Sequence, residues 1–324
     1  MRSPERRRAV VTGCAGFIGS TLCEALLVEG WSVTGVDAFT DTVPRAEREG
    51  NLSALGEEPR FDLVEADLLD LDLPAVLTGA HVVAHLAGRP GVRASFGDGF
   101  SAYLRDNVGA THRVLDAART ARVGRVVWAS SSSVYGDVGP GAADEGRPLD
   151  PRSPYALTKR GCEELAALAR ARGQDVVGLR YFTVYGPRQR PDMAVRRMCE
   201  ALCGGTGFTL LGDGTQVRDM THVDDVVDAT LRAMSASRAS ATYNVGGGAP
   251  VSLAGIIAAL EEIAGRPMPV RVAPVSAGDV ARTAADTTRA RVELGWRPAV
   301  PLNAGLAAQL AWVRERFGEP AAVR

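Results

Sequence analysis

The sequence predicts an α/β fold with a doubly wound parallel sheet, on the basis of two observations. First, strand-like runs alternate with helix-like runs, and such alternation is typical of a parallel sheet with helices on both faces. The strand-like runs are at residues 9–11, 31–36, 61–64, 81–86, 125–130 and 175–180, and the helix-like runs include 20–29, 103–121 and 155–171. Second, a glycine-rich turn joins the first strand to the first helix, and an acidic residue ends the second strand.

The composition is that of an ordinary globular protein with one large or two smaller domains: 324 residues, 46% hydrophobic and 23% charged. The formal net charge is −1, so no basic excess indicates a nucleic-acid partner. No apolar stretch is long enough for a signal peptide or a membrane-spanning helix, so no membrane association is expected. Five cysteines, an odd number without paired spacing, favour a reduced, cytoplasmic protein. No histidine is near Cys199 and Cys203 in sequence, so no metal site is expected.

The glycine-rich turn has the spacing of a dinucleotide-binding loop. Gly13 permits a tight turn, Gly16 lets the backbone approach a pyrophosphate, and Gly19 lets the helix pack closely on the strand. The N-terminus of that helix supplies N–H groups and a positive dipole end to the phosphates. Asp37 follows roughly 20 residues later, where an acid accepts a hydrogen bond from a ribose 2′-hydroxyl. Because an acid there repels a 2′-phosphate, the sequence predicts a Rossmann sheet that binds NAD rather than NADP.

The ends of the third and fourth strands offer further cofactor contacts. Asp67 and Leu68 follow the third strand, where the carboxylate could meet an adenine amino group. A loop aspartate that caps a turn fits the same spacing equally well. Leu86 and Ala87 end the fourth strand beside Gly88, and small residues there leave room for a ring to pass near the backbone.

Two stretches carry groups that can handle a proton. Ser130 to Ser133 follow the fifth strand, at the edge where ligands of open α/β sheets lie. Tyr155 and Lys159 stand one turn apart on a helix that begins at Ser153 and Pro154, so they share a face. An ammonium held near a phenol favours the phenolate, so the tyrosine can take or give a proton. Each stretch alone also fits an ordinary amphipathic helix or a loop whose hydroxyls bond their own backbone.

Together these motifs resemble the extended short-chain dehydrogenase/reductases, a family of NAD-dependent sugar-nucleotide epimerases and dehydratases, over nearly the whole chain. The matching stretches are Thr12–Gly19, the serine row with Tyr135 and Gly136, and Tyr155 with Lys159. The resemblance implies that Ser131, Tyr155 and Lys159 are catalytic; the family's catalytic Ser or Thr stands four residues before the tyrosine of Val-Tyr-Gly. It also implies cofactor contacts at Gly13, Gly16, Phe17, Ile18, Gly19, Asp37, Asp67, Leu68, Leu86, Ala87, Asn107, Tyr155, Lys159 and Tyr181.

The resemblance extends to domain organisation and assembly. It implies an NAD-binding Rossmann domain at residues 1–181, completed by segments near 219–248. A smaller, discontinuous, mixed α/β domain at 182–324 would then bind a UDP-sugar. Members of the family often pair through two long helices, so a homodimer through 103–121 and 155–171 is expected.

Two arginines of the second half are implied as ligands of the substrate diphosphate. Leu211–Asp219 looks like a hairpin whose Arg218 reaches the diphosphate, and Asp213-Gly214 is a good turn pair in its own right. Arg282 is the cation of a second matching segment, Gly278–Thr283. A surface ion pair is the alternative for both arginines, although two guanidinium groups suit a diphosphate well.

The absence of carboxyl groups from the serine row indicates which reaction follows the first step. The first step that the family shares is oxidation at C4, in which the tyrosine takes the 4-hydroxyl proton. The 4,6-dehydratases of the family carry an Asp-Glu pair where this chain has Ser132 and Ser133, and UDP-glucuronate decarboxylases carry a Glu at the position of Ser133. Without those carboxyl groups the ketone is left to turn over and take the hydride back on its other face. The resemblance therefore implies 4-epimerisation.

The substrate is read from the stretch that begins at Thr183. UDP-galactose 4-epimerases usually have Asn at this position, whereas residues 182–187, 190–194 and 89–95 closely resemble UDP-glucuronate 4-epimerases. For Arg190 an interdomain salt bridge is nearly as good an interpretation as carboxylate binding. The expected substrate-binding residues are Gly91, Val92, Arg93, Ser131, Ser132, Ser133, Tyr155, Thr183, Arg190, Met193, Arg218 and Arg282. The alternatives are a UDP-glucose or UDP-N-acetylhexosamine 4-epimerase, a UDP-glucuronate decarboxylase, or a non-catalytic NAD-binding regulator.

Overall fold

A computed structural model describes residues 7–204, 207–275 and 278–317, and it is built around one parallel sheet. Seven strands lie in the order β11-β6-β5-β4-β1-β2-β3, and all six neighbouring pairs are parallel. The predicted α/β class with a doubly wound parallel Rossmann sheet is confirmed.

The elements of the first part follow the predicted alternation. They are β1 (Arg8–Thr12), α1 (Phe17–Val28), β2 (Ser32–Asp37), α2 (Arg45–Asn51), η1 (Ser53–Leu55), β3 (Phe61–Glu65), α3 (Leu73–Leu77), β4 (Val82–His85), η2 (Arg93–Ser95), η3 (Gly97–Gly99), α4 (Phe100–Tyr103), η4 (Leu104–Gly109), α5 (Ala110–Thr120), β5 (Arg125–Ser131), η5 (Ser132–Tyr135), α6 (Pro154–Ala171) and β6 (Val176–Tyr181). The expected helix at 103–121 is interrupted, because η4 is a π-helical segment between α4 and α5.

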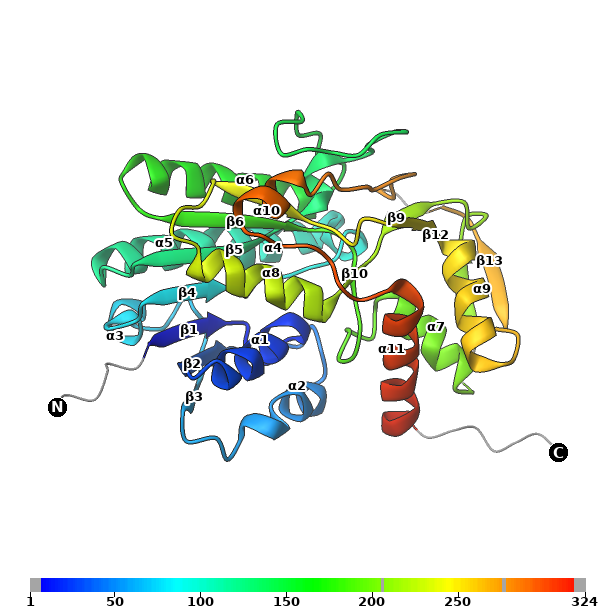
Figure 1. Cartoon of the computed structure of the whole chain (residues 1–324), viewed down its shortest axis with the longest axis horizontal. Coiled ribbons are helices and arrows are strands. Elements are labelled where there is room, and N and C mark those ends of the chain that lie inside the picture. The colour runs from blue at the N-terminus through cyan, green and yellow to red at the C-terminus, as the bar shows by residue number, and fades with distance from the viewer. Residues whose placement is uncertain (1–6, 205–206, 276–277, 318–324) are drawn as a thin grey trace.

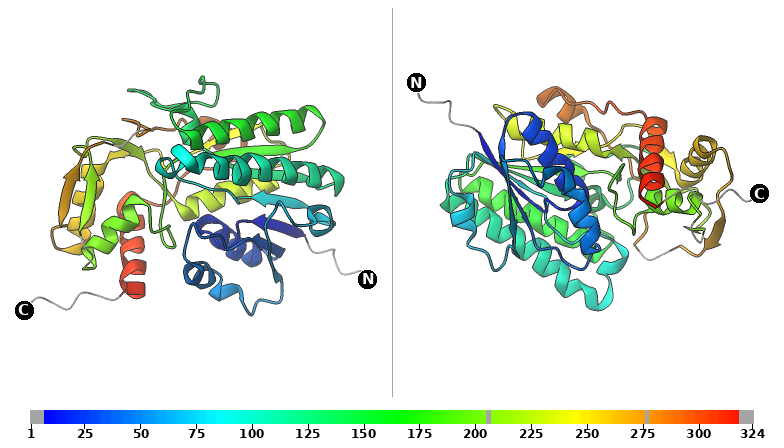
Figure 2. Two further views of the ribbon diagram at one scale, coloured as in Figure 1. Left: turned by 180° about the vertical axis from the view of Figure 1, so that it is seen from behind. Right: turned by 90° about the horizontal axis from the view of Figure 1, so that it is seen from below.

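Helices cover both faces of the sheet because its central strands are apolar on both sides. Alternate residues of β1 enter different cores: Ala9 and Val11 pack with α1 and α8, and Val10 packs with α3, α5 and α6. Figure 1 shows α1 and α8 on one face of the sheet, and the reverse view in Figure 2 shows α5 and α6 on the other.

The strand order places a ligand crevice at one edge. The chain moves outward from β1 through β2 to β3, and then crosses back to β4 on the other side of β1. In open α/β sheets this switch point, at the carboxyl ends of the strands, is where ligands bind. The glycine-rich turn after β1 and the loop after β4 both lie there.

The second part is smaller and mixed. Its elements are β7 (Val184–Tyr185), α7 (Ala194–Leu202), β8 (Phe208–Leu211), β9 (Val217–Asp219), β10 (Thr221–His222), β12 (Pro250–Ser252), α9 (Leu253–Ala264), β13 (Val270–Ala273) and α11 (Leu302–Phe317). The helices α7, α9 and α11 share one apolar core that includes Met198, Leu260 and Leu310. This group of elements lies beside the carboxyl edge of the large sheet (Figures 1 and 2).

Three elements of the second half return to the large sheet. These are α8 (Val223–Ser235), β11 (Thr242–Val245), which pairs with β6, and α10 (Thr288–Glu293). Residues of α8 and α10 contribute to the same core as α1. The large sheet and the helices that cover it are therefore assembled from distant parts of the chain.

The expected hairpin at Leu211–Asp219 is wrong. β8 pairs with β13, and β9 pairs with β12, so the two strands on either side of the turn belong to different sheets. The turn itself is present: the carboxylate of Asp213 accepts hydrogen bonds from the N–H and hydroxyl of Thr215. Among the described helices, no segment is long and apolar enough to cross a membrane.

Candidate active site

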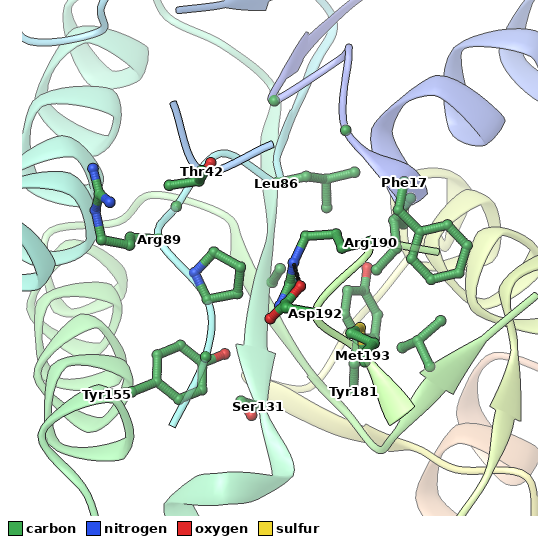
Figure 3. Close-up of a pocket in the computed structure, with 18 of the residues that line it drawn as sticks. Phe17, Thr42, Leu86, Arg89, Ser131, Tyr155, Tyr181, Arg190, Asp192 and Met193 are labelled. Atoms are coloured by element: carbon green, nitrogen blue, oxygen red, sulfur yellow. Dashed lines mark hydrogen bonds and ion pairs between the residues drawn. The ribbon is translucent and has the colours of Figure 1, made fainter. Parts of the chain in front are cut away.

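A cavity of about 910 Å³ lies at the carboxyl edge of the sheet and brings nearly all the predicted site residues together. Figure 3 shows Tyr155 from α6, Ser131 from the end of β5 and Leu86 from the loop after β4 around one space, with Arg190, Asp192 and Met193 of the second part on its other side. Of the predicted residues that the structure describes, Asn107 and Arg282 are the two outside the cavity lining.

The glycine-rich loop forms a cradle that side chains would fill. Gly13 has φ of +72°, and a Cβ there would lie 2.8 Å from the amide nitrogen of Ala87. A Cβ on Gly19 would collide with the carbonyl oxygen of Gly13. α1 begins directly after Gly16, so its first N–H groups are at the cavity wall. These observations fit a bound dinucleotide whose pyrophosphate lies against the backbone.

Asp37 ends β2 beside that cradle and is held in a fixed orientation. Its carboxylate accepts hydrogen bonds from the N–H groups of Ala15 at 3.0 Å and Phe39 at 2.9 Å. Arg48 of α2 donates to the same carboxylate at 3.1 Å, and both side chains are buried. The sequence analysis missed Arg48, because no local signal connects it with Asp37. A carboxylate held in this way at the end of β2 fits the ribose contact that NAD requires.

Asp67 closes a turn, as one of its two expected roles requires, and its contact with adenine stays a prediction. Its carboxylate accepts from the N–H of Leu69 at 2.9 Å, which closes a turn, and it also lines the cavity. Burial alone would raise its pKa, but the hydrogen bond from Leu69 and the ion pair with Arg105 outweigh burial and lower the pKa of Asp67. These contacts therefore favour an ionised carboxylate in the lining of the cavity.

The proposed catalytic residues Ser131, Tyr155 and Lys159 all line the same part of the cavity. The Nζ of Lys159 donates to the carbonyl oxygen of Ala129 at 2.8 Å, which fixes the ammonium under the end of β5. The hydroxyl oxygen of Ser131 accepts from the N–H of Ser133 at 3.2 Å and from its hydroxyl at 2.9 Å. The fold therefore brings an ammonium, a phenol and a hydroxyl into the lining of one cavity.

A buried ionic network holds the helix that carries the tyrosine and lysine. Glu163 of α6 accepts from Arg180 of β6 at 2.7 and 2.8 Å and from the hydroxyl of Ser130 at 2.6 Å. Arg180 also donates to the hydroxyl of Tyr135 at 2.6 Å. Burial alone would lower the pKa of Arg180, but the bonds to Glu163 outweigh it and raise the pKa. The sequence analysis missed this network, because its members are far apart in the chain.

Asn107 supports the cavity wall from behind. It is 1% exposed and lies in the π-helical segment η4. Its side chain exchanges two hydrogen bonds with the backbone of Arg89, at 2.7 and 3.1 Å, and donates to the hydroxyl of Thr158 at 3.0 Å. Asn107 therefore fixes the loop after β4 against α6, and the structure gives it this supporting position rather than a place in the cavity lining.

Thr183, Arg190 and Met193, which are expected to bind the sugar, also line the cavity. Arg190 donates to the carboxylate of Asp192 at 2.9 and 3.0 Å. Because both residues belong to one loop, this pair is not the interdomain salt bridge considered as an alternative. The sequence analysis also missed Asp192, which lines the cavity beside Arg190.

The two expected diphosphate ligands differ in position. Arg218 lines the cavity beside Asp279, with 3.9 Å between the charged groups, and burial lowers its pKa. Arg93 of the loop after β4 donates to the same aspartate at 3.3 Å. Arg282 forms a β-bridge with Val217, and its neighbours Val280 and Thr283 line the cavity while Arg282 does not. The contact of Arg282 with the diphosphate stays a prediction, since Arg282 is outside the cavity lining although Val280 and Thr283 belong to it.

Known proteins resemble this chain over nearly its whole length. Residues 9–246 match the family described as the NAD dependent epimerase/dehydratase family. The uncharacterized UDP-glucose epimerase YtcB of Bacillus subtilis is 38% identical over 313 residues, which is 96% of this chain and 99% of the relative. The structure of the UDP-glucuronic acid 4-epimerase of Bacillus cereus with UDP-glucuronic acid and NAD is 37% identical, with a TM-score of 0.93, over 96% of this chain and 100% of that one.

A further solved structure, MoeE5 in complex with UDP-glucuronic acid and NAD, is 40% identical, with a TM-score of 0.87, over 96% of this chain and 100% of that one. The same protein is also known in complex with UDP-glucose and NAD. Together with the cradle, Asp37 and the Ser-Tyr-Lys set, these findings define the class: the chain belongs to the NAD-dependent epimerase/dehydratase family of extended short-chain dehydrogenase/reductases. Within that family it is an NAD-dependent UDP-sugar 4-epimerase.

Proposed function

We propose that this enzyme interconverts UDP-glucuronic acid and UDP-galacturonic acid at C4 through a transient 4-keto sugar. The observation that carries the proposal is the sugar side of the cavity, where Ser132, Ser133 and Thr183 lie with Arg190. Hydroxyls and a guanidinium are groups that bind a carboxylate. The B. cereus relative holds UDP-glucuronic acid, in agreement with this assignment.

The residues of the chain provide the proton chemistry at C4. Tyr155 takes the proton of the 4-hydroxyl. It acts as a phenolate, which the nearby ammonium of Lys159 stabilises. Ser131 bonds the same oxygen and holds it in place. NAD, when bound at the cradle and Asp37, supplies the hydride acceptor and later the hydride donor. After the ketone has turned over, Tyr155 returns the proton to the oxygen on the opposite face.

Epimerisation is favoured over the other outcomes by the identity of two residues. Ser132 and Ser133 stand where dehydration or decarboxylation would need carboxyl groups. A 4-keto uronate is a β-keto acid, and it loses CO₂ when its carboxylate bond stands perpendicular to the carbonyl plane. We propose that the hydroxyls of Ser133 and Thr183 hold the carboxylate out of that alignment.

The test is to incubate the enzyme with UDP-glucuronate and with UDP-glucose separately and to resolve the epimers by chromatography. We expect turnover of UDP-glucuronate with at least a tenfold advantage in kcat/KM. Turnover of UDP-glucose alone would contradict the proposal and favour the second candidate, a UDP-glucose 4-epimerase, which the UDP-glucose complex of MoeE5 supports. Thr183→Ala and Ser133→Ala should release measurable CO₂ and a 4-keto-pentose; loss of activity without CO₂ would refute the role of these hydroxyls.

The proposal includes a homodimer in the cytoplasm. Leu157 and Leu168 of α6 are 51% and 58% exposed, and Leu104 of η4 is 43% exposed, which supports an interface along these helices. Light scattering with size-exclusion chromatography tests the dimer. Cys14, Cys23, Cys162 and Cys199 are free thiols, which suits a reducing compartment.

A further inference from the structure

The loop that carries Arg190 is held by buried side chains. This loop, Gly186–Arg190, runs from β7 toward α7. The N–H of Gly186 donates to the side-chain oxygen of Gln309 at 2.7 Å, and the amide of Gln309 donates to Gln189 at 2.6 Å. Gln189 and Gln309 are 1% and 0% exposed. The hydrogen bonds of Gln189 therefore determine where the neighbouring Arg190 lies.

Arg196 of α7 connects this loop with the cofactor domain. It donates to the backbone carbonyl of Gln189 at 3.0 Å and to both carboxylate oxygens of Glu47, at 2.6 and 3.0 Å. Arg196 is 1% exposed, and its guanidinium lies over the ring of Trp312 of α11. Glu47 belongs to α2 of the first domain. A bidentate pair between a buried arginine and a partly buried glutamate fixes the relative position of its two partners.

The same short helix α2 also supports the cofactor site. Arg48, next to Glu47, donates to the carboxylate of Asp37, the expected ribose ligand. Asn51 donates to the carbonyl oxygen of Ala15 in the glycine-rich loop at 3.0 Å. α2 is therefore in contact with Asp37 and with the glycine-rich loop. Through Glu47 it is also in contact with Arg196, which holds the Gly186–Arg190 loop.

A second arginine joins the loop to the phosphate-binding helix. Arg188 donates to the hydroxyl of Ser20 at 3.2 Å and to the carboxylate of Glu24 at 2.7 Å, both in α1. Its backbone φ is +69°, in the left-handed region that non-glycine residues seldom adopt. Such strain persists where surrounding contacts hold it, and it is common at functional sites. Arg188 also lines the cavity.

We propose that Arg196 and Arg188 are positioning residues that couple UDP-sugar recognition to NAD binding, through Glu47 on α2 and through Glu24 on α1. NAD binds at the glycine-rich loop and Asp37, and through these two contacts it stabilises the Gly186–Arg190 loop in the position that receives the sugar. By linkage, a bound UDP-sugar raises the affinity for NAD by the same factor. The inference rests on the proposed function in that Arg190 faces the uronate carboxylate.

The experiment measures NAD binding by calorimetry, with and without saturating UDP-glucuronate, in a Tyr155→Phe background that prevents turnover. The ratio of the two dissociation constants is the coupling factor, and for coupled sites it is typically about 5–150-fold. We expect Glu47→Gln to reduce the factor at least fivefold toward unity while the fold, followed by circular dichroism, is kept. Arg188→Gly removes the second contact and relieves the strained backbone, so it tests the proposal even if Glu47→Gln does not fold.

Arg119→Gln is the matched control, because Arg119 pairs with Asp116 within α5 alone. It should leave the coupling factor unchanged. A folded Glu47→Gln or Arg188→Gly enzyme with the wild-type factor would overturn the proposal, as would equal losses of NAD affinity with and without sugar. Repeating the titration with UDP-glucose separates the two proposals: coupling to UDP-glucose alone would refute the uronate assignment and leave the positioning role intact.

Discussion

Replacement of Glu163 by Gln tests whether the buried network under the active site stabilises the fold. The side chains of Glu163 and Arg180 are 12% and 6% exposed, and the carboxylate accepts three hydrogen bonds of 2.6–2.8 Å. Glu163→Gln leaves the guanidinium buried without a counter-charge and turns an amide donor toward it. Removing one partner of a buried ion pair costs about 3–5 kcal/mol. We expect the free energy of unfolding to fall by about 3 kcal/mol, because the amide keeps one acceptor.

The assay is urea denaturation at fixed pH and fixed NAD concentration, since bound NAD stabilises the folded state by mass action. A double variant, Glu163→Leu with Arg180→Met, is the control. It removes both charges together and should recover most of the lost stability, because no unpaired charge remains. A single variant within about 1 kcal/mol of the wild type, or a double variant as unstable as the single one, would refute the reasoning.

Three further results are expected. Gly19→Ala should weaken NAD binding at least tenfold, because its Cβ collides with the carbonyl of Gly13; unchanged affinity in calorimetry would contradict this. Tyr155→Phe should lower kcat about 10²–10⁴-fold with NAD still bound, and a normal rate would exclude the tyrosine as the acid–base group. Burial and Lys159 lower the pKa of His85 to about 3, against about 6.5 in the unfolded chain, so the unfolded state binds the proton first. The free energy of unfolding should therefore fall by up to about 1.4 kcal/mol per pH unit from pH 6.5 toward pH 3. Denaturation of His85→Gln over the same pH range should show that this contribution is lost.

Interactions between neighbours in the chain were predictable from the sequence. The glycine spacing from Gly13 to Gly19 depends on a turn of a few residues, and its conformation follows from the absence of Cβ atoms. Tyr155 and Lys159 share a helix face because they stand one turn apart. The acid at the tip of β2 follows from the length of one strand–helix–strand unit.

Interactions between distant residues were decided only by the tertiary structure. The wrong hairpin at Leu211–Asp219 shows this clearly: the turn residues were read correctly, but β8 and β9 pair with strands from elsewhere in the chain. Glu163 and Glu47 look like ordinary surface acids in the sequence, because nothing local marks Arg180 or Arg196 as their partners. Arg282 shares a segment with Val280 and Thr283 of the cavity lining, yet it is outside that lining itself, which the sequence does not reveal.

The sequence by itself thus determined the sheet class, the NAD loop and the tyrosine–lysine pair, because each depends on local geometry. The tertiary structure alone decided how Arg188 and Arg196 meet α1 and α2, because ion pairs of this kind form between groups that only the complete fold brings together.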